Sequence, residues 1–178
     1  EGVPILPAEL DVDRFLMNVE NGTLDLRTGE LREHRRADLL TKLAPVTYHD
    51  EATCPRFLAF LERVVPDASV RQFLRRAIGY ALTGSDREQC LFFLYGNGKN
   101  GKSTLLRVLQ ALLGDYARQC APDLLTARSS DRHPTELTVL FGARLVTSVE
   151  VDDGKRLAET LVKQMTGGDR IRARYLFA

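Results

Sequence analysis

The sequence predicts an α/β fold, and three features of its 178 residues support this prediction. Residues 91–95 form an apolar run of the length of a short strand, and a glycine-rich turn follows over 96–103. Apolar residues then recur with helical spacing over 105–113, which is typical of a helix that buries one face. A second apolar strand, over 144–150, lies further along the chain and ends in a carboxylate.

The glycine-rich turn reads GNGKNGKS and matches the pattern G-x-x-x-x-G-K-[ST] of a phosphate-binding P-loop. Its glycines allow a tight turn that exposes backbone N–H groups to phosphate oxygens, and the following helix adds its positive N-terminal end. Lys102 brings a charge for the β- and γ-phosphates, and Ser103 brings a hydroxyl for Mg²⁺. We therefore predict ATP and Mg²⁺ as cofactors. The predicted nucleotide-binding residues are Gly96, Asn97, Gly98, Lys99, Asn100, Gly101, Lys102, Ser103 and Thr104.

The helix after the turn is expected to be well buried, because it carries two apolar stripes. One stripe comprises Leu105, Val108, Leu109 and Leu112, and the other comprises Leu106 and Leu113. Together, the predicted strand, turn and helix place the start of an ATPase core near residue 86, and we expect this core to occupy residues 86–178.

Residues 1–85 predict a smaller unit, a β-meander followed by two helices. Asn21-Gly22 is a strong hairpin signal between two short apolar segments, and Thr28-Gly29 marks a second turn. Helical spacing follows over 57–65 and 70–82, with Asp67 or Ser69 as the cap of the second helix. We interpret two basic clusters in this unit as solvated surface or, alternatively, as phosphate contacts. They are Arg32, His34, Arg35 and Arg36, and then Arg71, Arg75 and Arg76.

Composition sets few limits on function. The net charge of +1 does not by itself indicate a nucleic-acid partner. Cys54, Cys90 and Cys120 show no metal-ligand spacing, and this usage is typical of a reducing, cytoplasmic setting. No apolar run reaches the length of a membrane span. Because the chain begins without methionine and ends in an apolar run, we interpret it as a fragment of a longer protein.

The second half continues the α/β pattern after the P-loop helix. We expect a short strand within 116–121, a polar loop over 127–132, a short helix over 134–140 and the strand over 144–150. Glu150 ends that strand, where a P-loop enzyme needs an acid to hold Mg²⁺ or to orient the attacking water.

Two more elements are expected after Glu150. An amphipathic helix over 155–165 is followed by a strand over 170–174. Arg170, Arg172 and Arg174 alternate along this strand and form one arginine face. Arginine grips backbone phosphate with two donors, so this face is a candidate contact for DNA.

Three segments in this order resemble the phage and plasmid primase-helicase family, within the superfamily three helicases of the AAA+ ATPases. They are YGNGKNGKSTLLRVLQALLGDYA, RLVTSVEVDDGKRL and LVKQMTGGDRIRARYL, and the upstream NVENGTLDLRTGEL is similar as well. The resemblance implies an ATP-driven DNA helicase that forms a ring, usually a homo-hexamer, around single-stranded DNA. It also implies a role in phage or plasmid replication in the cytoplasm of a bacterial host.

The resemblance assigns roles to particular residues. Lys102 and Ser103 correspond to the Walker A pair, and Glu150 corresponds to the Walker B acid. Lys163 and the stretch ending in Arg174 correspond to a helicase motif that leads into a DNA-contacting hairpin. Where many relatives have a second acid, this chain has Val151, and Asp152 is the alternative.

The family's sensor asparagine and arginine finger lie beyond such a hairpin, and a sensor strand pairs between the P-loop and Walker B strands. The expected ATPase sheet is therefore incomplete in these 178 residues, and the isolated chain is expected to bind nucleotide with weak or no turnover. Two alternatives stay open. One is a P-loop kinase whose arginine strand is a phosphate-binding lid, and the other is a module that binds nucleotide without hydrolysis.

Overall fold

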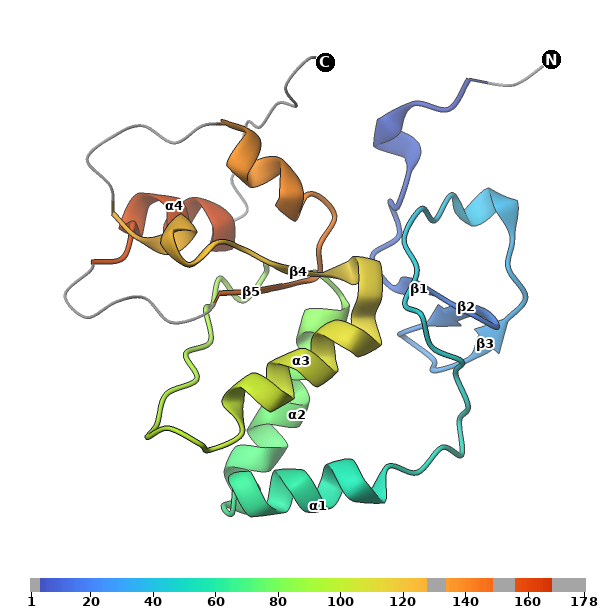
Figure 1. The fold of residues 1–178 in the computed structure, drawn as a ribbon. Helices are drawn as coiled ribbons and strands as arrows, with labels where there is room; N and C mark the ends of the chain where they lie inside the picture. The colour runs from blue at the N-terminus through green and yellow to red at the C-terminus, as the bar shows by residue number, and fades with distance from the viewer. Residues whose placement is uncertain (1–3, 128–133, 149–155, 168–178) are drawn as a thin grey trace.

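The computed structural model describes residues 4–127, 134–148 and 156–167. These residues form a small antiparallel sheet, a two-stranded parallel sheet and the helices around them (Figure 1). The predicted α/β class is thus confirmed. Of the larger P-loop sheet, the described residues form only the two parallel strands.

The predicted meander is present as a three-stranded antiparallel sheet of order β1-β2-β3. Its strands are β1 (Leu16–Val19), β2 (Gly22–Asp25) and β3 (Leu31–Arg32). Val19 pairs with Gly22, so the first turn consists of Glu20 and Asn21, one residue earlier than the sequence signal indicated. Gly22 instead begins β2, where a side chain would collide with the carbonyl oxygen of Arg32.

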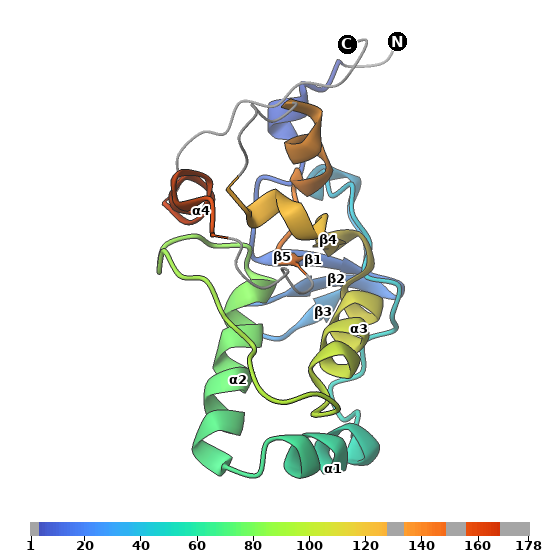
Figure 2. The ribbon, with the colours of Figure 1, turned by 60° about the vertical axis from the view of Figure 1, so that its left-hand side comes forward.

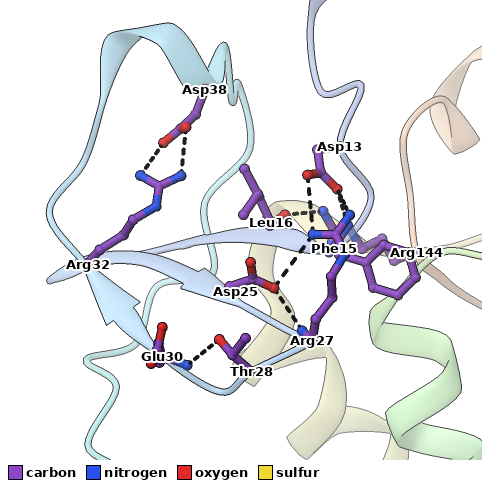
Figure 3. A network of polar contacts seen from close by, with 10 residues as sticks. All are labelled: Asp13, Phe15, Leu16, Asp25, Arg27, Thr28, Glu30, Arg32, Asp38 and Arg144. Carbon is purple, nitrogen blue, oxygen red and sulfur yellow. Dashed lines mark hydrogen bonds and ion pairs between the residues drawn. The ribbon is translucent and has the colours of Figure 1, made fainter.

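Ion pairs hold the segment after the meander in place (Figure 3). Arg32 on β3 donates two hydrogen bonds to Asp38, at 2.7 and 2.8 Å. This fixes the short 3₁₀ helix η2 (Arg36–Asp38) against the sheet. The Arg32 guanidinium also holds the pKa of the Asp38 carboxyl below its ordinary value.

The predicted helical pair is confirmed as α1 (Pro55–Val64) and α2 (Ala68–Leu82). Asp67 is the cap of α2, because its side chain accepts hydrogen bonds from the backbone N–H groups of Ser69 at 2.7 Å and Val70 at 3.4 Å. Neither helix has a fully buried residue, and Phe73 on α2 is half exposed. The pair therefore packs on the rest of the molecule through partly covered faces.

The strand predicted over 91–95 is absent, and this corrects the sequence prediction. The segment runs as coil between α2 and the P-loop helix, and all five side chains are exposed, Tyr95 at 92% (Figure 1). A strand is stable only when neighbouring backbone pairs with it. Among the described residues, no segment pairs with 91–95, so its apolar side chains have no sheet to pack in.

The P-loop helix is α3 (Lys102–Leu113), and it leads through a tight turn into β4 (Ala117–Gln119). Its buried residues are Leu105, Leu109 and Leu113, one narrow stripe with a spacing of four. Val108 and Leu112 of the first predicted stripe are exposed, so the expectation of a well-buried helix was wrong for the face that carries these two residues. That face lies open because the described chain packs no second layer on it.

The remaining described elements lie close to their predicted ranges, except that the helix expected over 155–165 begins only at Glu159, because residues 156–158 are not helical. β5 (Leu145–Thr147) pairs in parallel with β4, a 3₁₀ helix occupies Pro134–Leu140, and α4 (Glu159–Thr166) follows. The predicted strand over 170–174 and all but the first residue of the loop over 127–132 lie outside the described residues. In the part that is described, no helix has both the length and the hydropathy needed to cross a bilayer.

One hydrophobic core joins the two predicted units. Met17, Val19 and Leu24 of the meander pack with residues from the end of α3 and from β4. The partners are Leu113, Tyr116 and Ala117, and Ala44 completes the cluster. The meander is therefore packed directly against the far end of the P-loop helix.

We expect Leu113→Ala to lower the free energy of unfolding by about 2–5 kcal/mol, because the side chain leaves a cavity at the centre of this core. Leu113 is 1% exposed, whereas its neighbour Leu112 is 46% exposed. Leu112→Ala is the matched control and should cost less than about 1 kcal/mol. Urea unfolding followed by circular dichroism measures both, and equal losses would show that the core does not lie here.

The Arg32–Asp38 pair predicts a pH dependence of stability. Because the folded pKa of Asp38 is lowered, its carboxylate stabilises the fold above the unfolded pKa of about 4, and this contribution is lost as pH falls through the folded pKa. Asp38→Asn should cost about 1–2 kcal/mol at pH 7. The difference from wild type should close below about pH 4, in unfolding curves recorded from pH 7 to pH 2.5. A constant difference over this range would contradict the assignment.

Candidate functional site

The P-loop turns through backbone conformations that favour glycine. Gly96 has φ +138° and Gly101 has φ +84°, and Lys99 also has a positive φ, +61°. A Cβ on Gly96 would lie 2.5 Å from Nδ2 of Asn100. The Asn100 side chain can move away from such a Cβ, so the positive φ of Gly96 is what favours glycine at the first position of the loop.

Helix α1 of the helical pair packs closely against the P-loop at Gly101. A Cβ on Gly101 would lie 2.8 Å from a methyl carbon of Val64 and 3.1 Å from the ring of Phe60, both on α1. Figure 2 shows this corner, with the loop between α1 and the beginning of α3. Gly98, in contrast, has no atom within 4 Å of its Cβ position, so the middle of the loop faces open space.

Lys102 points back over the loop from the first residue of α3. Its ammonium donates to the carbonyl oxygen of Gly96 and to Oδ1 of Asn100, each at 2.9 Å. Both partners are neutral, and no carboxylate in the described part of the chain pairs with this charge. The loop therefore encloses a cation whose charge is not compensated.

Ser103 and Thr104 are exposed in the first turn of α3. The first intrahelical bond joins the N–H of Leu105 to the carbonyl oxygen of Gly101, at 2.9 Å. The N–H groups before Leu105 are thus available to an anion. The curled backbone, the uncompensated lysine and the free helix start fit the phosphates of a nucleotide, and Ser103 fits an oxygen ligand of Mg²⁺.

Glu150, Asp152, Arg170, Arg172 and Arg174 lie outside the described residues. The structure does describe the strand that leads to Glu150. Thr147 at the end of β5 is buried and accepts a hydrogen bond of 2.6 Å from Gln110 of α3. This contact, which the sequence reasoning missed, ties the P-loop helix to that strand.

Lys163 is described and lies on α4, with a side chain that is 80% exposed. Its nearest acidic partner is Glu159 one turn earlier, at 3.8 Å. Such an exposed pair contributes little to stability, so Lys163 is available for another contact. The described residues contain no cluster of three or more His, Cys, Asp and Glu side chains that could hold a metal ion by itself.

Arg144, directly before β5, is a half-buried residue that sequence reasoning did not single out. Its guanidinium donates to the carbonyl oxygen of Leu16 at 2.6 Å (Figure 3). It also donates to the carbonyl oxygen of Leu82 at 2.8 Å and lies 4.4 Å from the ring centroid of Tyr116. Burial lowers the pKa of Arg144 from its ordinary value. Gly84 leaves room for the Arg144 side chain, because a Cβ on Gly84 would lie 3.0 Å from Cγ of Arg144. This glycine is the one feature of the sequence that relates to the position of Arg144.

Comparison with known proteins places the first third of the chain in context. Residues 3–66 match the family model described as D5 N terminal like. This match covers the meander and α1, and ends before α2.

Curated relatives match over nearly the whole chain. The putative helicase L207/L206 of Acanthamoeba polyphaga mimivirus is 31% identical over 174 residues, which cover 94% of this chain and 18% of that protein. The putative helicase 121R of Invertebrate iridescent virus 3 is 29% identical over 176 residues, 94% of this chain and 19% of the relative. The putative primase C962R of African swine fever virus (isolate Warthog/Namibia/Wart80/1980) is 24% identical over 176 residues, 94% of this chain and 18% of the relative.

The chain thus spans less than a fifth of the length of these relatives. The family model and the relatives together support a primase-helicase family for it.

Arg144→Met should lower the free energy of unfolding by about 2–4 kcal/mol, because the carbonyl oxygens of Leu16 and Leu82 lose a charged donor inside the protein. Arg107→Met is the matched control on the exposed side of α3, where arginine makes one long bond of 3.3 Å to a backbone oxygen. It should change stability by less than about 0.5 kcal/mol in the same urea titration. If the two variants lose the same amount, Arg144 does not join the meander, α2 and β5.

Proposed function

We propose that this chain is the ATP-binding part of a replication helicase of the primase-helicase type. The observation that carries the proposal is the loop itself, curled around the uncompensated charge of Lys102 at the start of α3. The helicase and primase names of the relatives support a replicative role for a protein with such a loop.

In the proposed site, residues 96–104 bind the phosphates of ATP. ATP supplies the phosphoanhydride bond whose hydrolysis releases energy. Lys102 stabilises the charge that develops on the phosphates, and Ser103 holds Mg²⁺. Glu150 completes the ion's surroundings or orients the attacking water, and Asp152 is the candidate for a second acid.

We further propose that the complete motor is of the AAA+, superfamily three type. Parallel pairing of β4 with β5 supports this, since both strands follow the P-loop helix in chain order. In such a motor, residues 91–95 become a strand when another segment pairs with them. The exposure of all five apolar side chains agrees with that role.

Lys163, Arg170, Arg172 and Arg174 are the proposed contacts to single-stranded DNA, within a homo-hexameric ring. Phosphate contacts of this kind bind many sequences, because they do not read base edges. A nucleotide-binding module without turnover is the second candidate, and the unpaired segment 91–95 favours it for the 178 residues alone.

Lys102→Ala is expected to weaken binding of a fluorescent ATP analogue by about 10-fold or more, since it removes a charged donor from the phosphates. In the full-length gene product, it should abolish the ATP hydrolysis that single-stranded DNA stimulates. Lys163→Ala is the matched lysine variant, exposed and on another helix.

The control should keep wild-type affinity for the nucleotide and reduce only the stimulation by DNA. ATP turnover that does not respond to DNA but needs a small phosphate acceptor would contradict the helicase proposal and support a kinase. If the full-length protein binds ATP but does not hydrolyse it, the remaining alternative is a module that binds nucleotide without turnover.

A further inference from the structure

We propose that a cavity beside the meander is a second phosphate-binding site, separate from the P-loop. The cavity has a volume of about 410 Å³, within the range of small-molecule sites. It lies between β1, β2 and the segment that carries η2. The residues that line it are Leu10, Asn18, Thr23, His34, Arg35, Arg36, Leu39, Leu40 and Thr41. We call it the meander cavity.

The charged residues that line the meander cavity are all basic. Arg35, Arg36 and His34 bring basic groups, and none of the nine residues carries a carboxylate. A second cavity next to the same sheet shows the contrast, because Asp25, Glu30 and Asp50 are among its lining residues. An anion is therefore attracted to the meander cavity and repelled from its neighbour.

The acids closest to the meander cavity already have partners. Asp38 accepts both hydrogen bonds of Arg32, and Asp11 accepts from the backbone N–H of Thr41 at 2.8 Å and from its hydroxyl. Arg35 is near enough to Asp38 to lower the pKa of that carboxyl slightly, as the last of several causes. Within the described residues, neither Arg35 nor Arg36 forms an ion pair.

Asn18 supplies a polar group that lacks a partner in the wall of the cavity. Its side-chain carbonyl oxygen is buried and accepts no hydrogen bond among the described residues. The backbone N–H of Asn18 is held by the hydroxyl of Tyr116 at 3.0 Å, so the residue itself cannot move away. Buried polar atoms are rarely left unpaired, so the Asn18 amide is a sensitive reporter of any change in the wall of the cavity.

The ligand that fits these groups is a phosphate. Guanidinium groups bind phosphate oxygens with paired N–H donors, and Arg35 and Arg36 bring two such groups to this cavity. The shared chemistry is a phosphate group, which either a nucleic-acid backbone or a free nucleotide can supply. The site involves no residue of the P-loop, so it stands whether or not the loop hydrolyses ATP.

Arg35→Ala/Arg36→Ala tests the proposal in the Lys102→Ala background, where the P-loop contributes little. Both arginines are exposed, so the fold should be unchanged in circular dichroism and urea unfolding. The matched control is Arg75→Ala/Arg76→Ala, two consecutive exposed arginines on α2 with the same loss of charge. Binding of a fluorescent oligothymidine is measured by anisotropy at several salt concentrations.

The cavity variant should bind the oligonucleotide about 10-fold more weakly and lower the salt slope by about two, whereas the control should stay within about 2-fold of the background protein. Equal losses in the two variants would overturn the proposal, because they would show general attraction rather than a site.

A second measurement separates the sources of phosphate. The side-chain amide signal of Asn18 is followed by NMR during titration with the oligonucleotide, with AMP and with inorganic phosphate. A shift with all three supports a site for phosphate itself, a shift with the oligonucleotide alone supports a backbone site, and a shift with AMP alone supports a nucleotide site. If none of them moves the signal and the cavity variant binds like the background protein, the meander cavity is not a phosphate site.

Discussion

The half-buried guanidinium of Arg144 joins three parts of the structure that are far apart in the sequence. It donates to the last part of α2 through Leu82 and to β1 through Leu16, and it lies against Tyr116 at the end of α3. A charge in such a place is costly unless fixed acceptors surround it. The two acceptors come from two separate elements and the ring from a third place, so the guanidinium keeps all three contacts only when α2, β1 and Tyr116 are in their native places.

Tyr116 extends this connection into the meander. Its hydroxyl accepts from the backbone N–H of Asn18 at 3.0 Å and donates to the carbonyl oxygen of Lys42 at 3.2 Å, while its ring lies in the common core. Burial raises the pKa of this hydroxyl, so it stays a neutral donor at ordinary pH. Tyr116 and the guanidinium of Arg144 therefore hold β1 next to the end of α3. β1 forms a wall of the meander cavity, and α3 begins at the P-loop.

Local signals predicted the parts of the fold that local chemistry decides. The cap at Asp67, the helical spacing that follows it and the P-loop pattern from Gly96 to Ser103 each depend on residues close in sequence, and the structure has them where expected. The strand over 91–95 depends on a partner that its own residues do not supply, so an apolar run alone was not sufficient. Arg144 could not be predicted either, because its acceptors are 62 and 128 residues away.

The P-loop and the hydrophobic core lie at opposite ends of α3. The 12 residues of α3 span roughly 18 Å, with Lys102 at the P-loop end and Leu113 in the core with the meander. Gly101 rests on α1 at the first end, and Gly114, where a side chain would collide with Pro45, ends the helix at the other. Because both ends are fixed by close contacts, the orientation of α3 is set by the meander and the helical pair. These elements therefore support the geometry of the P-loop.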